Sequence, residues 1–172
     1  PAAVAGAMAE APFVAAVDGF APEGLNVDLA FRVERLVPFL RHLADQGVER
    51  VVFAGAVQRP RLDPGLLDPD TAAMLPRLMQ AMAAGDDATL RAVLEIFAEF
   101  GFDVAGLDEV APSLLPQAGM LAGLVTPRDE ADAARAARIV AALGAVDVGQ
   151  GAVVAQGLCL GVEALPGTDA LL

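Results

Sequence analysis

The sequence predicts an α/β fold with a parallel or mixed sheet, and three observations lead to this expectation. Short apolar runs typical of buried strands alternate with longer stretches whose apolar residues recur at helical spacing. The 172 residues suffice for one full domain, or for one domain and the beginning of a second. Near residue 146 the alternation gives way to two strand-like runs around a tight turn, which indicates a second unit.

Each element is predicted from its own pattern of apolar side chains. Strands are expected where short apolar runs end in a turn, at residues 12–20, 26–31, 51–54 and 102–106. Helices are expected where the chain is rich in Ala or where apolar residues recur every three or four positions, at residues 2–11, 33–43, 75–84, 127–143 and within 85–102. Pro38 should kink the second of these helices or delay its start, and Gly47 should end it.

Packing and capping have separate roles in the helix within residues 85–102. Its apolar face is expected to consist of Leu90, Val93, Leu94 and Phe97. Burying four such side chains is worth roughly 6–12 kcal/mol before entropy, whereas a helix cap contributes only about 1 kcal/mol. Packing should therefore decide that this helix forms, and Asp86 or Asp87 should cap it and decide where it begins.

The last part of the chain reads as a hairpin followed by the start of a helix. Two apolar runs flank Gln156 and Gly157, a pair that favours a tight turn. Further on, Thr168 is expected as an N-cap and Asp169 as an acid in the first helical turn. We therefore expect an N-terminal α/β domain over residues 1–145 and the beginning of a second α/β domain over residues 146–172.

Composition excludes several classes of function. Eleven Lys and Arg residues against 23 Asp and Glu residues give a formal net charge of −12, which repels a phosphate backbone, so nucleic acid is not expected as a partner. No apolar stretch approaches the ~20 residues that a spanning helix needs, and no basic segment precedes an apolar run at the start, so we expect neither a membrane span nor a secretory signal. Cys159, the single cysteine, is expected to be a small buried apolar residue.

Two candidate sites lie in the first predicted domain. Asp86 and Asp87 are adjacent carboxylates at a helix start and could bind Mg²⁺, although capping explains them equally well. Arg59 lies in the loop after a buried strand, a place suited to bidentate phosphate recognition, although surface loops also carry Arg without such a role.

Two further candidates lie in the second predicted domain. Gly149 and Gly151 bracket Gln150 and could let backbone N–H groups approach an anion. Thr168 and Asp169 add a hydroxyl and a carboxylate at a helix start, where free N–H groups favour anions, although an N-cap alone would explain them. From the residues alone, the sequence therefore predicts an acidic α/β chain with an anion site and no identified reaction.

Taken together, three stretches resemble the LpxI family of bacterial UDP-2,3-diacylglucosamine pyrophosphatases of lipid A biosynthesis. They are FAGAVQRP at 53–60, GDDATLRAVLEIFAEFGF at 85–102 and VDVGQGAVVAQGLCLGVEALPGTDALL at 146–172. The last is the most specific, because the family reads D-I-G-Q-G-A-V-V, then an apolar strand ending in V-E-A, then G-T-D-A. The family's chains are longer, so the resemblance implies a missing first strand with its Gly-rich loop and a missing remainder of the C-terminal domain, with the catalytic acid beyond Leu172.

The resemblance also implies an activity and a set of contacts. It implies a Rossmann-like N-terminal domain and Mg²⁺-assisted hydrolysis of UDP-2,3-diacylglucosamine to UMP and 2,3-diacylglucosamine 1-phosphate, with water as the nucleophile. The expected substrate contacts are Arg59, Gln150, Thr168, Asp169, Asp86 and Asp87, and the expected metal ligands are Asp169 and Glu163.

The expected partner is the lipid-nucleotide substrate, and the expected location is cytoplasmic. Peripheral contact with the inner membrane and a homo-oligomer are further expectations. Two other readings stay open, a non-catalytic nucleotide- or lipid-binding α/β module and an oligomerisation domain.

Overall fold

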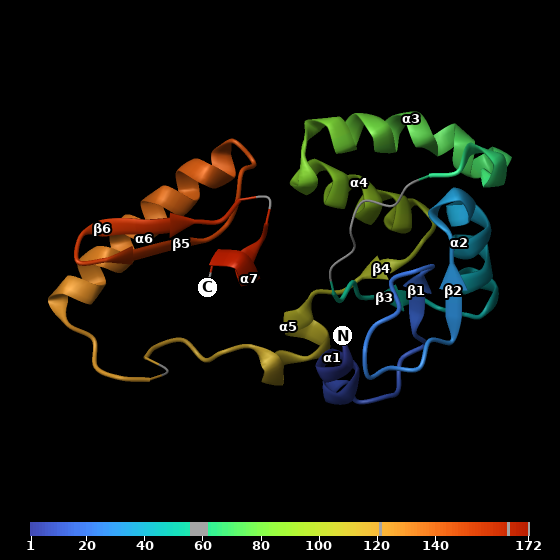
Figure 1. Ribbon diagram of the computed structural model, residues 1–172. Helices are drawn as coiled ribbons and strands as arrows, with labels where there is room; N and C mark the ends of the chain where they lie inside the picture. The colour runs from blue at the N-terminus through green and yellow to red at the C-terminus, as the bar shows by residue number, and fades with distance from the viewer. Residues whose placement is uncertain (56–61, 121, 165, 172) are drawn as a thin grey trace. The chain divides into compact units, whose positions relative to one another are not determined.

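A computed structural model shows an α/β chain made of two units (Figure 1). It describes residues 1–55, 62–120, 122–164 and 166–171. The first compact unit is Pro1–Pro116, and the second is Gln117–Leu172. This division differs from the boundary expected after residue 145, because helix α6 (Pro127–Ala145) packs against strand β5 (Ala152–Ala155) of the second unit.

The strands of the first unit pair in parallel, as the alternation of strands and helices predicts. Strand β1 (Ala15–Val17) pairs with β2 (Leu29–Phe31), and β3 (Arg50–Val51) pairs with β4 (Asp103–Val104). Each described sheet has two strands. The strands are shorter than expected, because the ladders cover only part of each apolar run.

The helical elements of the first unit include the four expected helices in the predicted order, together with short helical elements that were not expected. In chain order, the helical elements of this unit are α1 (Ala2–Ala7), η1 (Val33–Arg35), α2 (Leu36–Asp45), η2 (Pro64–Leu66), α3 (Pro69–Ala84), α4 (Asp86–Glu99), α5 (Leu107–Val110) and η3 (Pro112–Leu114). A 3-10 turn precedes α2, so Pro38 falls in the first turn of the helix, where proline is tolerated. Helix α3 begins earlier than expected because Asp68 caps it, accepting the Thr71 N–H at 3.0 Å.

The start of α4 corrects the expectation for the two adjacent acids. Gly85 is the N-cap, with a φ of +136° that L side chains rarely adopt, and no side-chain cap hydrogen bond is present. Asp86 and Asp87 are the first residues of the helix. Asp87 pairs with Arg91 at 2.8 Å, one turn further along. The expectation that either acid caps α4 is therefore wrong.

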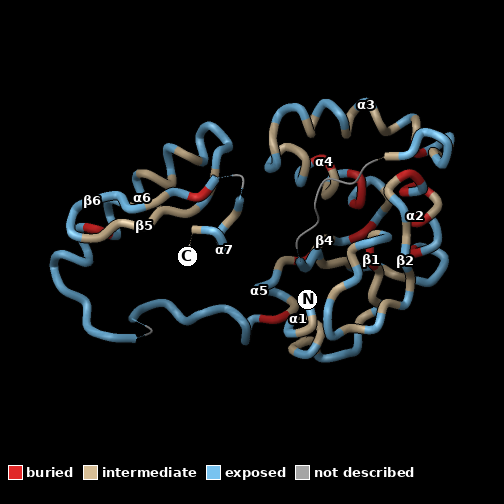
Figure 2. Tube along the Cα trace, viewed as in Figure 1, coloured by how far each residue is buried: buried red, intermediate tan, exposed pale blue. Residues whose placement is uncertain are grey.

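An apolar core holds the first unit together, and its buried residues lie mainly on α2 and α4 (Figure 2). Leu40 and Ile96 are completely buried, and Phe31 stacks on Phe39 with ring centroids 3.8 Å apart. The expected face of α4 is partly wrong, since Phe97 is buried but Leu90 is 51 % exposed. The core is completed by Leu36, Phe39, Leu43 and Phe102.

The second unit is a helix packed against a hairpin. Strand β6 (Leu158–Val162) runs antiparallel to β5, and α7 (Thr168–Leu171) follows. Gln156 and Gly157 both have positive φ, at +53° and +76°, as a two-residue hairpin turn of the I′ kind requires. The predicted hairpin and its turn are thus confirmed.

Helix α6 begins where the sequence predicts, and side-chain hydrogen bonds fix its N-terminus and tie it to the hairpin. The Thr126 hydroxyl accepts the Asp129 N–H, and the Asp129 carboxylate accepts the Thr126 N–H, so the two residues form a capping box. Hydrogen bonds from the Thr126 hydroxyl and N–H hold the pKa of Asp129 below its ordinary value. In the next turn the buried Asp132 accepts the Gly157 N–H at 2.7 Å, which ties the hairpin turn to α6.

Cys159 is exposed rather than buried, so that expectation is wrong. The described sheet of this unit has two strands, and α6 packs against β5, which leaves β6 largely uncovered.

Candidate functional site

The candidate site is built around the carboxylate of Glu163, directly after β6. Glu163 is 7 % exposed, and both of its oxygens accept hydrogen bonds. Oε2 accepts the backbone N–H of Gln150 at 3.0 Å, and Oε1 accepts the hydroxyl of Thr168 at 2.7 Å. One buried acid therefore joins the loop before β5 to the first residue of α7.

Two glycines allow Glu163 to come this close to the loop. A Cβ at Gly149 would lie 2.3 Å from the carbonyl oxygen of Glu163, and a Cβ at Gly151 would lie 3.1 Å from Glu163 Oε2. The Glu163 N–H also donates to the carbonyl of Gly151 at 2.8 Å. The sequence predicts that these glycines admit an anion to the backbone, and among the described residues the anion that meets the Gln150 N–H is Glu163 itself.

The side chain of Leu171 in helix α7 packs closely against two glycines, Gly151 and Gly161. A Cβ at Gly161 would lie 2.8 Å from Leu171 Cδ1, and a Cβ at Gly151 would lie 3.1 Å from Leu171 Cδ2. Neither Gly161 nor Leu171 is predicted as part of the site. Gly161 could have been found from the sequence, because a glycine inside an apolar strand often marks the close approach of another segment.

The structure brings together only some of the predicted site residues. Gln150, Glu163 and Thr168 meet, with Gln150 taking part through its backbone N–H. Asp169 is exposed in the first turn of α7. Asp86 and Asp87 are exposed and belong to the other unit, and Arg59 lies outside the described residues.

The described residues offer a limited ligand set for Mg²⁺. Outside the gaps at 56–61, 121, 165 and 172, no three His, Cys, Asp or Glu side chains gather as a metal-binding group. Mg²⁺ is commonly held by one or two carboxylates, with substrate phosphates and water completing the octahedron. Asp169 fits that role because its carboxylate is exposed, whereas Glu163 directs both oxygens at donors of its own chain.

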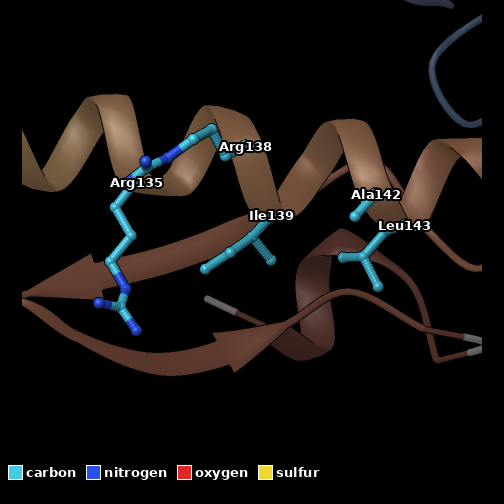
Figure 3. Close-up of a pocket in the computed structure, with 5 residues that line it drawn as sticks. All are labelled: Arg135, Arg138, Ile139, Ala142 and Leu143. Atoms are coloured by element: carbon cyan, nitrogen blue, oxygen red, sulfur yellow. The ribbon is translucent and has the colours of Figure 1, made fainter.

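The same unit has an open hollow along α6. It has a volume of about 420 Å³ and is lined by Arg135, Arg138, Ile139, Ala142 and Leu143. Arg135 extends toward the hairpin from the side of α6 that also carries Ile139 and Leu143, while Arg138 lies along the helix (Figure 3). The hollow thus combines guanidinium groups with an apolar floor.

Within the described part of the chain, no helix combines the length and the apolar character needed to cross a membrane.

The fold and the site define an α/β protein whose second unit carries a buried carboxylate, a glycine-bracketed amide and a threonine hydroxyl. The LpxI N-terminal domain family model matches residues 1–114, and the LpxI C-terminal domain family model matches residues 117–172. The chain therefore belongs to the LpxI family, as the sequence motifs predict.

One relative extends this finding. The chain is 42 % identical over 132 residues to the UDP-2,3-diacylglucosamine pyrophosphatase LpxI of Caulobacter vibrioides. The aligned residues cover 76 % of this chain and 47 % of the relative. The chain thus spans about half the length of the curated relative that it matches.

Proposed function

We propose that this protein hydrolyses the pyrophosphate bond of UDP-2,3-diacylglucosamine, giving UMP and 2,3-diacylglucosamine 1-phosphate. The observation that supports this most strongly is the 42 % identity to a relative named for that activity, together with matches to both LpxI domains. The site adds chemical support, because pyrophosphate cleavage depends on positioned water and neutralised phosphate charge rather than on a protein nucleophile.

The site residues receive separate roles in this proposal. Asp169 is proposed as a carboxylate ligand of a divalent cation, Mg²⁺ being the expected one, with substrate phosphate oxygens completing its shell. Bound there, the cation would neutralise charge on the phosphates. Thr168, Gln150 and Arg59 are proposed to line the substrate, with Asp86 and Asp87 as weaker contacts. A metal-ligand role for Glu163 remains a prediction, although its two hydrogen bonds favour a supporting role.

The proposal extends to the fold of the first unit, the partner, the cellular location and the oligomeric state. We propose that the first unit is Rossmann-like, which the parallel pairing of β1 with β2 and of β3 with β4 supports. The proposed partner is the lipid-nucleotide, and the proposed location is the cytoplasm with peripheral contact to the inner membrane, where such a lipid would reside. A homo-oligomer is also proposed. The net charge of −12 opposes nucleic acid as a partner.

The direct test is release of UMP from UDP-2,3-diacylglucosamine by the full-length protein with Mg²⁺. We expect turnover that stops when EDTA removes the cation and returns when Mg²⁺ is restored. The matched variant is Asp169→Asn, which keeps the shape of the side chain and removes its charge. We expect it to lower kcat at least about tenfold and to raise the Mg²⁺ concentration needed for half-maximal rate.

Two results would contradict the proposal. Binding of UMP without any hydrolysis would favour a non-catalytic binding module instead. A stable assembly whose melting temperature no nucleotide or lipid shifts would favour an oligomerisation domain. An Asp169→Asn variant that keeps full activity would remove Asp169 from the site and leave the reaction itself in place.

A further inference from the structure

The Thr168 hydroxyl is already committed as a donor inside the protein. A threonine hydroxyl has one proton to donate and two lone pairs to accept with. Its proton points to Oε1 of Glu163, with the oxygens 2.7 Å apart. An ionised carboxylate only accepts hydrogen bonds, so the direction of this bond is fixed as long as Glu163 is charged. Thr168 Oγ1 is left with lone pairs to offer to another group.

Glu163 cannot easily turn away from this bond. Its other oxygen accepts the Gln150 N–H at 3.0 Å, and its own N–H donates to the Gly151 carbonyl at 2.8 Å. A Cβ at Gly149 would clash with the backbone oxygen of Glu163, and a Cβ at Gly151 would lie 3.1 Å from Glu163 Oε2, closer than an ordinary contact. The acid is buried, and breaking the contact would leave buried polar groups without partners, which is unfavourable.

From this geometry we propose that Glu163 is a positioning residue that makes Thr168 a hydrogen-bond acceptor, so that Thr168 holds the attacking water and does not donate to a phosphate oxygen. The inference rests on the proposed function, since it concerns the water of that hydrolysis. Thr168 keeps its hydroxyl proton throughout and is therefore not the base. When the water oxygen bonds to phosphorus, the bond from that phosphorus to the bridging oxygen breaks, the bridging oxygen leaves with the other phosphate, and the proton that the water loses passes to solvent. The geometry thus assigns Thr168 to the nucleophile side of the reaction.

The kinetic test uses three substitutions in the full-length protein. Thr168→Val removes the hydroxyl with little change in shape, and we expect kcat to fall roughly 10- to 100-fold with KM nearly unchanged, because orientation of the water matters in the transition state. Thr168→Ser keeps both the proton and the lone pairs and should stay within about threefold of the parent. Glu163→Gln should lower kcat about as much as Thr168→Val. Glu130→Gln, which neutralises an exposed acid of α6, is the matched control and should leave kcat unchanged.

If Thr168 acted as a hydrogen-bond donor to the substrate, the variants would have different effects on kcat and KM. If Thr168 donated to a phosphate oxygen, Thr168→Val would raise KM and weaken binding of UMP with kcat unchanged. Glu163→Gln would then tighten substrate binding, because the hydroxyl proton would be released for the phosphate. Either of these results, or full activity in both Thr168→Val and Glu163→Gln, would overturn the inference.

A structural measurement separates this inference from the proposed reaction. In NMR spectra of the chain, the Gln150 amide proton should be protected from exchange and shifted downfield. Glu163→Met, which has no oxygen to accept the Gln150 N–H, should abolish both effects, while Glu130→Met preserves them. If these signals behave as expected but the full-length protein releases no UMP, the proposed reaction fails and the Glu163 arrangement stands. Unprotected Gln150 in the parent chain would overturn the arrangement itself.

Discussion

The two units bury different kinds of side chain. Of the described residues, all twelve buried hydrophobic side chains lie in the first unit, where α2 and α4 pack around Leu40 and Ile96. In the second unit the described buried residues are two acids, Asp132 and Glu163. Apolar burial therefore organises the first unit, whereas hydrogen bonds to buried carboxylates hold the loops of the second.

Two buried glutamates, one in each unit, also differ in their surroundings. Glu34 is 3 % exposed, accepts the Asp63 N–H at 2.8 Å and lies 3.3 Å from the Arg32 guanidinium. Those hydrogen bonds, led by the one from Asp63, hold its pKa below the ordinary value against the effect of burial. Glu163 likewise accepts a backbone N–H, but its second donor is a hydroxyl, and it has no ion pair among the described residues. Glu34 secures a loop against a packed core, and Glu163 secures the candidate site.

The largest effect is expected from truncating a core side chain of the first unit, and it should be confined to that unit. Ile96→Ala should lower the free energy of unfolding by about 2–5 kcal/mol, because a fully buried side chain is replaced by a cavity. Since the chain has no Trp or Tyr, hydrogen exchange read by peptide mass is the suitable measurement. Protection should fall in residues 36–45 and stay constant in residues 127–163.

The control for Ile96→Ala lies in the same helix. Leu90→Ala removes a side chain that is 51 % exposed, and its effect should stay within about 0.5 kcal/mol. Equal loss of protection in both units after Ile96→Ala would show that the two units do not differ in the way their buried residues indicate.

A smaller effect is expected from a methyl group at the candidate site. Gly149→Ala should destabilise the second unit by about 1–3 kcal/mol, because the new Cβ would lie 2.3 Å from the backbone oxygen of Glu163. Gly144→Ala is the matched control, since its Cβ would meet no atom within 4 Å and alanine favours the helix by up to about 1 kcal/mol. Exchange protection in residues 150–163 should drop only in Gly149→Ala. Unchanged protection there would contradict the close approach.

The smallest expected effect is a change of stability with pH in the first unit. Because the folded pKa of Glu34 lies below its unfolded value, Glu34 stabilises the fold above the ordinary glutamate pKa of about 4.3. This contribution is lost as pH falls through the folded pKa. Glu34→Gln cannot titrate, so the difference in stability between parent and variant should shrink on acidification. Asp68 and Asp129, whose pKa values are also lowered, titrate in both proteins and cancel. A difference that stays constant from pH 7 to pH 3 would contradict this expectation.

Local patterns predicted the elements whose causes are local. The Gln156-Gly157 turn, the start of α6 at Pro127 and the strand positions all follow from a few neighbouring residues. Predictions failed where two signals competed at short range. Asp68 and Pro69 start α3 before the expected residue 75, and Gly85 takes the cap position that was expected for Asp86 or Asp87.

The candidate site was predicted in its members and not in its arrangement. The motif at residues 146–172 pointed to Gln150, Glu163, Thr168 and Asp169, because each residue type suits phosphate or metal chemistry. The local sequence does not show that Glu163 accepts hydrogen bonds from both Gln150 and Thr168, since Gln150 and Glu163 are thirteen positions apart. Cys159 was misplaced for a similar reason, because a strand's own sequence does not show whether anything covers it.

By itself, the sequence determined the α/β class, the hairpin, the start of α6 and the family, because short-range backbone preferences and motif spacing are encoded in consecutive residues. Only the tertiary structure decided that α6 belongs with the hairpin, that Leu90 is exposed and that the glycine-bracketed amide binds the protein's own acid. Those outcomes depend on which surfaces meet after the chain has folded, and the free energy of such contacts comes from residues distant in sequence.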